Sequence, residues 1–470
     1  MVKMKKISKL NGLILIGVFL VLMYMIYNLN ILPFRYFLII GGILLLFVLL
    51  FVFKLVRDKT GFISRILFNI LSIVFIAGQI YLMTYINATK DFMNSLVAKN
   101  FEEVTYDVVV NSNGSMDHMG DLYNKEVGYL ESDKNYKLVK FKIRQDVKYK
   151  EKKYKEVDNF VEDITMGNVN GVIVEDSYYS LLKEEDADLS LNTKIIKQYK
   201  IIVKKGNKKK VKSTSTEPFL IYISGIDTYG QISSVSRSDV NILAAVNPKT
   251  GKILLVSIPR DYYVQLHNTT GTKDKLTHAG IYGIDTSMET INDLLDTKID
   301  YFIRLNFSTL TKSIDLLDGV DVYSDKDLQL GKIKINQGMN HMDGETALAF
   351  ARERKSYATG DRHRGENQQA IITAMIKKMT SKEYITKYKD ILTSLEGTFE
   401  TSMTYDEMTD IFKMQISKRI DWQIESISLD GRGSMQPTYS MGSRNLYVMV
   451  PDEATVNNAK DKLNEYLEEK

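Results

Sequence analysis

The sequence of 470 residues contains no cysteine, which excludes disulfides, zinc–thiolate centres, iron–sulfur clusters and a cysteine nucleophile. An excess of charge of one sign is also lacking, because 62 Lys and Arg residues face 58 Asp and Glu residues and leave a formal net charge of +4. This nearly equal number of positive and negative side chains argues against a protein whose main function is to coat nucleic acid. Metal-ligand spacing is missing among the five histidines, which we interpret as surface or structural residues: His118, His267, His278, His341 and His363.

Apolar residues are concentrated at the amino-terminal end of the chain. Three segments, at about 10–27, 36–56 and 66–86, approach the ~20 residues that cross a bilayer. The lysines that precede the first segment also suit a signal peptide, but no small-residue cleavage site follows them and two further apolar segments do. We therefore predict a membrane region over 1–97 with three transmembrane helices.

Basic residues in the short loops predict the orientation of these helices. The leading lysines and the basic loop at 54–65 belong in the cytoplasm, whereas the first connection carries only Arg35. We expect a multi-pass protein of the cell membrane with a cytoplasmic amino terminus. The large carboxyl-terminal part then lies outside the cell.

The next part of the chain, 98–215, is rich in Lys and Tyr and is expected to form a small α/β accessory domain. Strand-like alternation occurs at 136–143 and 195–203. Lysine runs at 148–155 and 204–212 favour a solvated hairpin and a linker over a nucleic-acid-binding face. A weaker alternative is attraction to anionic lipid headgroups or wall polymers.

The remaining residues, 216–470, carry the chemistry. A short apolar run ends just before Asp227, as in a buried strand that delivers a carboxylate at its carboxyl end. Strands at 239–246 and 252–258 are joined by good turn residues, and a hairpin centred on Lys249 places position 239 opposite 259. This pairing brings four charged residues together at the rim of a sheet: Arg237, Asp239, Arg260 and Asp261.

Alternating helices and strands follow this hairpin and predict an α/β sandwich. We expect helices at 285–296 and 307–317 and strands at 299–306 and 320–323. Their apolar residues fit a core, although some helices could instead line a slot for a ligand tail. The single Trp422 lies in a strand-like stretch at 421–428 and is expected in the core rather than on a carbohydrate platform.

Two Arg-x-Arg pairs form the densest cluster of charge in the sequence, Arg352 with Arg354 and Arg362 with Arg364. An extended segment points both members of such a pair to one side, whereas a helix splays them by about 200 degrees. We expect a helix to begin after Gly365, with Gln368 and Gln369 in its first turn and its NH groups near an anion. The alternative is a solvated basic loop paired with nearby acids.

Several convergent arginines suit a ligand with several negative charges, such as a pyrophosphate. Asp227 and Asp239 could hold Mg²⁺ between themselves and phosphate oxygens, which predicts phosphoryl transfer assisted by a Lewis acid. The phosphate-binding loop of ATPases, Gly-x-x-x-x-Gly-Lys-Ser/Thr, is absent from the sequence, so a kinase or ATPase is a weak alternative.

Three ordered motifs carry a resemblance to a known family: "ISGIDTYGQISSVSRSDVNILAAVNPKTGKILLVSIPRD" from Ile223 to Asp261, then "ALAFARERK" and "GDRHRGENQQ". Together they resemble the LytR-CpsA-Psr family of cell-wall enzymes. The three membrane helices and the accessory domain are similar to those of its CpsA-type members, which attach capsular polysaccharide. The resemblance implies an α/β/α sandwich with a central mixed sheet and a polyprenyl tail held in an apolar tunnel. We expect residues 242–246 and the helices after Asp285 and Gly365 to wall that tunnel.

The resemblance also implies an activity and its site. A glycan linked to polyprenyl pyrophosphate is moved to a sugar hydroxyl of peptidoglycan, with Mg²⁺ as cofactor and Mn²⁺ as an alternative. Asp227 and Asp239 match the metal-binding acids, and Asp239 is also a candidate general base. The positions that match the catalytic and pyrophosphate-binding groups are Arg237, Arg260, Arg352, Arg354, Arg362, Arg364 and Gln368.

One position departs from the family pattern, because Asn367 stands where many members have Arg. A phosphate contact is then absent or supplied by Arg362. Other functions remain as alternatives: a membrane-bound transcriptional attenuator, as older labels of the family suggest, or a non-catalytic partner in capsule assembly. Nucleic acid is not an expected partner, since the basic runs would lie outside the cell and no helix-turn-helix pattern is present. The expected partners are the lipid-linked glycan, peptidoglycan, membrane lipid and capsule synthesis proteins.

Overall fold

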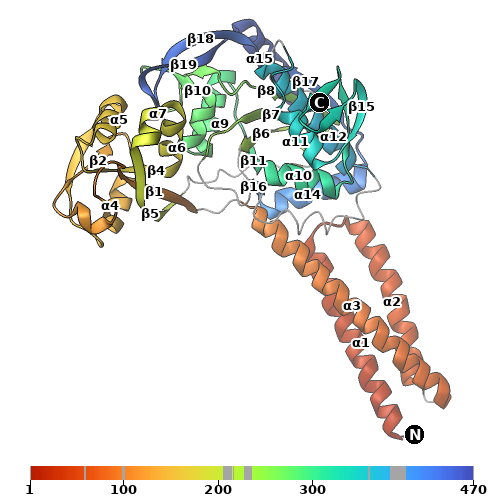
Figure 1. The fold of residues 1–470 in the computed structure, drawn as a ribbon. Coiled ribbons are helices and arrows are strands. Elements are labelled where there is room, and N and C mark those ends of the chain that lie inside the picture. Colours follow the sequence, from red (N-terminus) through yellow and green to blue (C-terminus); the bar gives the residue numbers. More distant parts are fainter. Residues whose placement is uncertain are drawn as a thin grey trace.

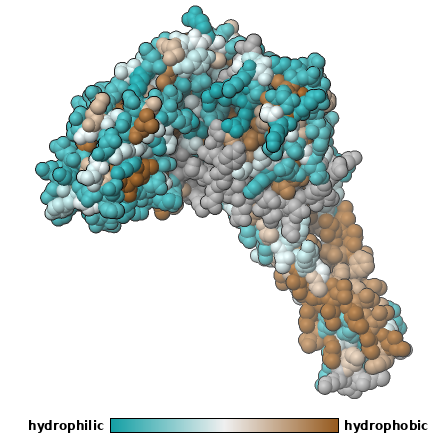
Figure 2. Space-filling model, viewed as in Figure 1, coloured by the Kyte–Doolittle hydropathy of each residue, from teal (hydrophilic) through white to brown (hydrophobic). Residues whose placement is uncertain are grey.

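The computed structural model describes residues 2–57, 60–97, 101–204, 214, 216–226, 236–357, 360–381 and 399–468. Three amino-terminal helices form a long bundle that carries the rest of the chain at one end (Figure 1). They are α1 (Val2–Leu29), α2 (Phe34–Val56) and α3 (Phe62–Leu96), and each is long and apolar enough to cross a membrane. Figure 2 shows that hydrophobic side chains cover the bundle, in contrast to the hydrophilic surface of the other parts.

Polar residues inside the bundle link the first and third membrane helices. Asn11 of α1 donates hydrogen bonds to Asn69 Oδ1 at 3.1 Å and to Ser72 Oγ at 2.6 Å, both on α3. Such polar pairs hold helices together in a membrane, where solvent cannot replace them. The helix α3 continues past the predicted end at Ile86 to Leu96.

The accessory domain is α/β, as expected, with a five-stranded sheet in the order β3-β2-β4-β1-β5. The strands are β1 (Phe101–Asn111), β2 (Glu126–Leu130), β3 (Lys150–Tyr154), β4 (Gly171–Glu175) and β5 (Thr193–Lys204). The helices are α4 (Tyr136–Ile143), α5 (Val157–Met166), α6 (Asp176–Glu185) and α7 (Ala187–Asn192), with a 3₁₀ turn η1 (Met119–Leu122).

The predicted strand at 136–143 is wrong, because α4 occupies these residues. Its buried residues, Tyr136, Val139 and Ile143, are spaced by three and four positions and so lie on one face of a helix. The predicted strand at 195–203 is confirmed as part of β5. The first lysine run lies on β3 at an edge of the sheet, where charged residues block pairing with other chains. Residues 205–212 of the second run lie outside the described residues.

A mixed six-stranded sheet forms the centre of the last part of the chain, in the order β16-β11-β6-β7-β8-β17. Its strands are β6 (Phe219–Ile226), β7 (Val240–Asn247), β8 (Lys252–Ser257), β11 (Tyr301–Asn306), β16 (Phe399–Thr401) and β17 (Gln423–Ser428). The predicted hairpin is confirmed in β7 and β8, which pair antiparallel. Gly251 closes its turn with a φ of 72°.

Helices cover both faces of this sheet, which confirms the α/β/α sandwich. One face packs on α9 (Ile284–Leu295) and α15 (Glu453–Glu468). The other faces α12 (Asp361–Met379) and α14 (Tyr405–Lys418), with α10 (Phe307–Leu316) and α11 (Gly344–Arg352) beside them. Short elements complete this part: β9 (Tyr263–Val264), β10 (Asp274–Lys275), α8 (Leu276–Ala279), η2 (Gly280–Tyr282), β12 (Val320–Ser324), β13 (Leu328–Leu330), β14 (Ile333–Ile335), β15 (Gly338–Met342), β18 (Gly431–Thr438) and β19 (Gly442–Pro451).

The hairpin of β18 and β19 reaches from the part with the six-stranded sheet to the accessory domain (Figure 1). Tyr178 donates its hydroxyl to Ser440 O at 2.6 Å, and Arg444 forms an ion pair with Asp186 at 2.6 Å. Met441 belongs to the apolar core of the accessory domain. The two parts are therefore packed together by side chains from both.

Candidate functional site

The directions of the strands bring distant residues to one rim of the central sheet. β6, β8, β11 and β17 run parallel to one another, so their carboxyl ends meet at the same edge. β7 runs antiparallel, and its amino end lies at that edge. Asp239, Arg260 and Asp430 lie just outside the sheet at this rim, and Asn306 is the last residue of β11. Asp227, predicted to follow β6, lies outside the described residues.

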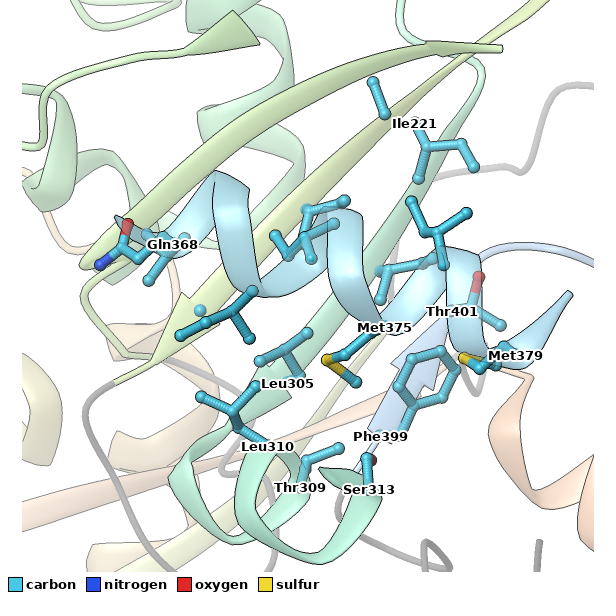
Figure 3. A pocket seen from close by; sticks show the side chains of 18 of the residues that line it. Ile221, Leu305, Thr309, Leu310, Ser313, Gln368, Met375, Met379, Phe399 and Thr401 are labelled. Carbon is cyan, nitrogen blue, oxygen red and sulfur yellow. The ribbon is translucent and has the colours of Figure 1, made fainter. Parts of the chain in front are cut away.

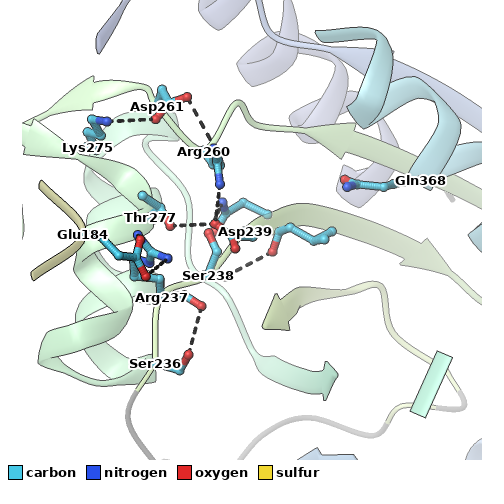
Figure 4. A network of polar contacts seen from close by, with 12 residues as sticks. Glu184, Ser236, Arg237, Ser238, Asp239, Arg260, Asp261, Lys275, Thr277 and Gln368 are labelled. Atoms are coloured by element: carbon cyan, nitrogen blue, oxygen red, sulfur yellow. Dashed lines mark hydrogen bonds and ion pairs between the residues drawn. The ribbon is translucent and has the colours of Figure 1, made fainter. Parts of the chain in front are cut away.

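The centre of the rim is an ion pair between Asp239 and Arg260. Arg260 NH1 donates to Asp239 Oδ1 at 2.9 Å, and the Thr277 hydroxyl donates to the same oxygen at 3.3 Å (Figure 4). The register of the hairpin, with Ile242 opposite Ser257, places position 239 opposite 260. The predicted register, 239 opposite 259, was wrong by one residue.

The carboxyl of Asp239 is held in its ionised form. Burial alone would raise its pKa, but the charges of Arg260 and Arg237 outweigh burial and hold the pKa below its usual value. The hydrogen bond from Arg260 and the charge of Arg364 act in the same direction. Asp239 is therefore a carboxylate at neutral pH.

A second layer of charge supports Arg260. Asp261 Oδ2 lies 3.6 Å from Arg260 Nε, and Lys275 Nζ lies 3.4 Å from Asp261 Oδ1 (Figure 4). Asp261 is 8% exposed. These contacts hold the Arg260 guanidinium in its direction toward Asp239.

Arg237 has a partner that the sequence did not indicate. Its guanidinium meets Glu184 of α6 in the accessory domain, with NH1 to Oε2 at 2.7 Å and NH2 to Oε1 at 3.1 Å. This two-pronged contact is the geometry that an arginine also offers to a phosphate. Arg237 thus stands beside Asp239 with its fork already engaged by a carboxylate.

The first Arg-x-Arg pair does not lie in a single extended segment. Arg352 is the last residue of α11, and extended backbone begins at Glu353. The Arg352 guanidinium carbon lies 4.7 Å from the centroid of the Phe307 ring, at the point where β11 passes into α10. Arg354 is exposed on the following loop. The structure therefore anchors Arg352 at the rim and leaves Arg354 in solvent.

The second Arg-x-Arg pair is helical, which corrects the prediction that a helix begins after Gly365. α12 begins at Asp361, so Arg362 and Arg364 diverge by about 200 degrees. Arg362 NH1 pairs with Asp430 at 2.6 Å, whereas the charge of Arg364 reaches Asp239. Their expected convergence on one side is wrong.

The glutamines of α12 lie beyond its first turn, another correction. Gln368 lies one helical turn after Arg364 on the same face, and its amide donates to Ala351 O at 3.2 Å. Gln369 is buried and donates to Leu255 O of β8 at 3.0 Å and to Ile427 O of β17 at 2.8 Å. Asn367 is also buried, and its amide donates to Phe350 O at 3.1 Å. Its side chain therefore joins α12 to α11.

An apolar cavity of about 500 Å³ adjoins the rim. Asp239, Arg352 and Gln368 border it at one end, and its walls come from the face of the sheet that α12 covers. In Figure 3, its lining follows α12 from Gln368 at one end to Met379 and Phe399 at the other. Trp422 is 9% exposed and contributes to the core beside this far end.

The walls of the cavity differ in part from the prediction. Residues Ala244 and Val246 of β7 and the helix α12 do line it. The helix α9, expected after Asp285, packs on the opposite face of the sheet with α15. α10 takes its place, together with residues of α3 and α14.

A hard cation fits the donor set at Asp239, although the structure carries no ligands. Both bonds described above engage Oδ1 of Asp239, and Mg²⁺ is commonly bound by one or two carboxylates with water and substrate phosphates completing the sphere. Among the residues that the structure describes, no group of three or more His, Asp or Glu side chains forms a cage. Asp239 is therefore the group that could hold such an ion here.

Several residues at the rim carry no signal that sequence reasoning could have used. Glu184 and Thr277 are distant from their partners in the chain, and the charged run at 183–186 that contains Glu184 gives no indication of a contact with Arg237. Phe307 was predicted to lie in a helix, but its contact with Arg352 was not predicted. These contacts depend on how the elements are packed, which local spacing does not encode.

Comparison with known proteins identifies relatives of the chain. The sequence profile of the LytR_cpsA_psr family matches residues 178–465. A polyisoprenyl-teichoic acid–peptidoglycan teichoic acid transferase TagU of Bacillus cereus is 33% identical over 259 residues, which cover 55% of this chain and 82% of that protein. The TagU of Enterococcus faecalis is 30% identical over 238 residues, which cover 50% of this chain and 77% of that protein.

A solved structure, TagV of Bacillus subtilis, is 29% identical with a TM-score of 0.45 and covers 54% of this chain and 98% of its own. The profile extends over more than half of the chain and includes all three of the motifs described above. This chain belongs to the LytR-CpsA-Psr family.

Proposed function

We propose that this chain transfers a glycopolymer from a polyprenyl-pyrophosphate carrier to a sugar hydroxyl of peptidoglycan. The observation that carries the proposal is the apolar cavity that ends at Asp239, Arg352 and Gln368. The site thus has an apolar part and a charged part, and a lipid diphosphate likewise has a long apolar tail and a compact, highly charged head. The two TagU proteins to which this chain is similar are named as polyisoprenyl-teichoic acid–peptidoglycan teichoic acid transferases, and their names support the same class of reaction.

The arginines of the rim would bind the diphosphate from different sides. Arg260 and Arg364 flank Asp239, and Arg352 lies at the mouth of the cavity. We assign them to the pyrophosphate, together with Gln368 and Arg237. Arg354 is exposed nearby and can close on the substrate from solvent. Arg362 is engaged by Asp430, so its assignment to the pyrophosphate requires that pair to open.

The reaction forms one phosphorus–oxygen bond and breaks another. The acceptor hydroxyl oxygen attacks the phosphorus next to the glycan, the bridging oxygen leaves with polyprenyl phosphate, and the hydroxyl proton passes to water. Positioned positive charge stabilises the charge that develops on the leaving phosphate. Mg²⁺ at Asp239 and Asp227, or Mn²⁺ in its place, would add a Lewis acid. The lowered pKa of Asp239 suits it to a cation better than to proton removal.

The site of action follows from the membrane helices. The distribution of basic residues supports a cytoplasmic amino terminus, and three membrane-spanning helices would then leave the catalytic part outside. Both substrates, a lipid-linked glycan and peptidoglycan, are accessible there. We propose a capsular or other wall polysaccharide as the polymer, and capsule synthesis proteins as partners, because the architecture resembles that of CpsA-type members.

The test uses the full chain in nanodiscs, since α3 lines the cavity and a soluble fragment would lose that wall. A labelled polyprenyl-pyrophosphate glycan is incubated with peptidoglycan, with Mg²⁺ or with EDTA. We expect labelled peptidoglycan with the wild type and a loss of at least about tenfold in Arg260→Ala and in Arg352→Ala. Arg432→Ala, which removes an exposed arginine on β18, is the matched control and should retain the product.

Two results would contradict the proposal. Wild-type protein that binds the lipid donor with every metal but never forms the covalent product would favour a carrier or assembly partner. Transfer that is equally reduced in Arg432→Ala would show that loss of positive charge in general, not the rim, is responsible.

A further inference from the structure

The last turns of the third membrane helix form part of the cavity wall. Phe92, Met93 and Leu96 of α3 line the cavity and are 3%, 1% and 7% exposed. The next residue, Val97, forms a β-bridge with Thr401 at the end of β16. The pocket proposed for the lipid is thus built in part from the membrane anchor itself.

The helix α14 ties the same end of the cavity to the membrane bundle. Its residues Met408 and Phe412 line the cavity. On the outside of this helix, Tyr405 donates its hydroxyl to Leu29 O at 2.5 Å, and Lys413 Nζ donates to Asn30 Oδ1 at 2.6 Å. Arg35 NH2 also donates to Ser417 O at 3.1 Å. These bonds fasten α14 to the connection between α1 and α2, so the far end of the cavity faces the bilayer.

Helix geometry gives the height of this end above the hydrocarbon. The apolar part of α3 ends at Ile86, and Phe92 follows six residues later, about 9 Å further along the helix. The polar headgroup region adds roughly 5 to 8 Å to each side of the hydrocarbon core. Phe92 and Met93 therefore lie at the level of the headgroups or just above them.

We propose that the tail of the carrier lipid enters the cavity directly from the outer leaflet, between α3 and α14, where Met93, which is 1% exposed, closes the wall until the tail displaces it. This inference rests on the proposed function. The diphosphate reaches the rim at Asp239 while the distal part of the tail stays in the bilayer. The lipid is never released into water.

The length of the cavity supports this arrangement. Its wall along α12, from Gln368 to Met379, covers about 16 Å, which is roughly half of a 30 Å hydrocarbon core. A tail longer than this wall has to leave the cavity at the α3 end, whereas a short tail fits inside it. The entrance therefore matters for long-chain donors and not for short ones.

The first test obstructs the entrance in the full chain in nanodiscs. Met93→Trp is assayed with an undecaprenyl-pyrophosphate glycan and with its geranyl-pyrophosphate counterpart. We expect the ratio of long-donor to short-donor transfer to fall at least about tenfold relative to wild type. Retained use of the short donor also shows that the variant is folded.

Ile73→Trp is the matched control, because it places the same ring on the lipid-facing side of α3, where Ile73 is 58% exposed. If Met93→Trp loses transfer equally with both donors, or with neither, the proposal that the lipid tail enters between α3 and α14 is wrong. If wild-type protein transfers from neither donor, the proposed function fails, and the second test decides the entrance by itself.

The second test reads occupancy without catalysis. Because the chain has no native cysteine, Met93→Cys introduces a single thiol, and since this position is 1% exposed, its reaction with a small membrane-permeant methanethiosulfonate reports transient opening at α3. Undecaprenyl pyrophosphate should slow that reaction several-fold and geranyl pyrophosphate should not. Ile73→Cys should be unaffected by either lipid. Absence of protection, or the same protection by the short lipid, would contradict entry of a long tail past α3.

Discussion

Single residues at the rim show that each arginine has its own partner. Arg260 pairs with Asp239, Arg237 with Glu184 of the accessory domain, and Arg352 lies on the Phe307 ring. These contacts hold the guanidinium groups in place before any substrate arrives. A preformed set of donors needs less reorganisation when an anion binds.

The two arginines of α12 are expected to have different functions, although they are two residues apart. Arg364→Ala should weaken binding of the pyrophosphate donor about tenfold to a hundredfold, because it removes a charge directed at Asp239. Arg362→Ala should change that affinity less than about fivefold, since Arg362 pairs with Asp430 and diverges from Arg364 by about 200 degrees around α12. Titration of the donor analogue by calorimetry measures both.

Thermal unfolding of the two variants serves as the control. Neither substitution should cost more than about 1 kcal/mol of stability, so lost binding cannot be attributed to unfolding. Similar losses of affinity in both variants would show that Arg362 leaves Asp430 to reach the substrate.

At the scale of elements, α12 is the helix that determines the site. It carries Arg364 and Gln368 at the rim, walls the cavity, and is bound through Gln369 to the backbones of β8 and β17. A Cβ added to Gly365 would lie 2.4 Å from Ser257 Oγ of β8. The glycine thus permits the close approach of helix and sheet.

Gly365→Ala should destabilise the fold by about 1 to 2 kcal/mol, although alanine is the better helix former. The added methyl group has to displace the Ser257 hydroxyl or the helix. Ser257→Ala in the same chain removes that oxygen and should restore most of the loss. Denaturant unfolding of the single and double variants gives the coupling energy.

A stabilising effect of Gly365→Ala alone would contradict this account. Helix propensity would then outweigh the contact with Ser257, and the space between α12 and β8 would be larger than the structure shows.

The hairpin of β7 and β8 could be predicted because its signals are local. Two apolar runs flank a turn rich in Asn, Pro and Gly, and the pairing of Asp239 with Arg260 follows from the register to within one residue. The three membrane helices were equally evident from length and apolar content. Features of this kind need no knowledge of tertiary packing.

The start of α12 and the nature of α4 could not be predicted in the same way. Gly365 suggests a helix boundary, yet it lies inside α12 because the sheet leaves no room for a side chain. Residues 136–143 alternate well enough for a strand, but Tyr136, Val139 and Ile143 bury a helical face instead. In both segments tertiary packing decides between two structures that the local pattern allows.

At the scale of the whole molecule, the accessory domain reaches the catalytic rim through Glu184. This carboxylate is 55% exposed and occupies the fork of Arg237, which lies beside Asp239. A donor diphosphate brings negative charge to the same fork. In the proposed function, Glu184 would compete with the diphosphate for Arg237.

Glu184→Gln should tighten binding of the pyrophosphate donor about two- to fivefold, because it frees Arg237 and removes a nearby negative charge. Glu185→Gln is the matched control, since it removes the same charge from the adjacent, exposed position on α6. Donor titration at low and moderate salt measures the difference, which screening should reduce. Weaker binding in Glu184→Gln would instead mean that Glu184 positions Arg237 for the substrate.

The contacts between the accessory domain and the β18–β19 hairpin limit the order in which the chain can fold. Tyr178 and Ser440 are bonded although they are 262 residues apart in the sequence. Met441 completes an apolar core whose other members include Phe160 and Tyr179, which are synthesised much earlier. That core stays open on one side until nearly the whole chain has been made. Contacts of such long sequence separation slow folding, so the nascent protein passes through a stage at which it depends on protection from aggregation and proteolysis.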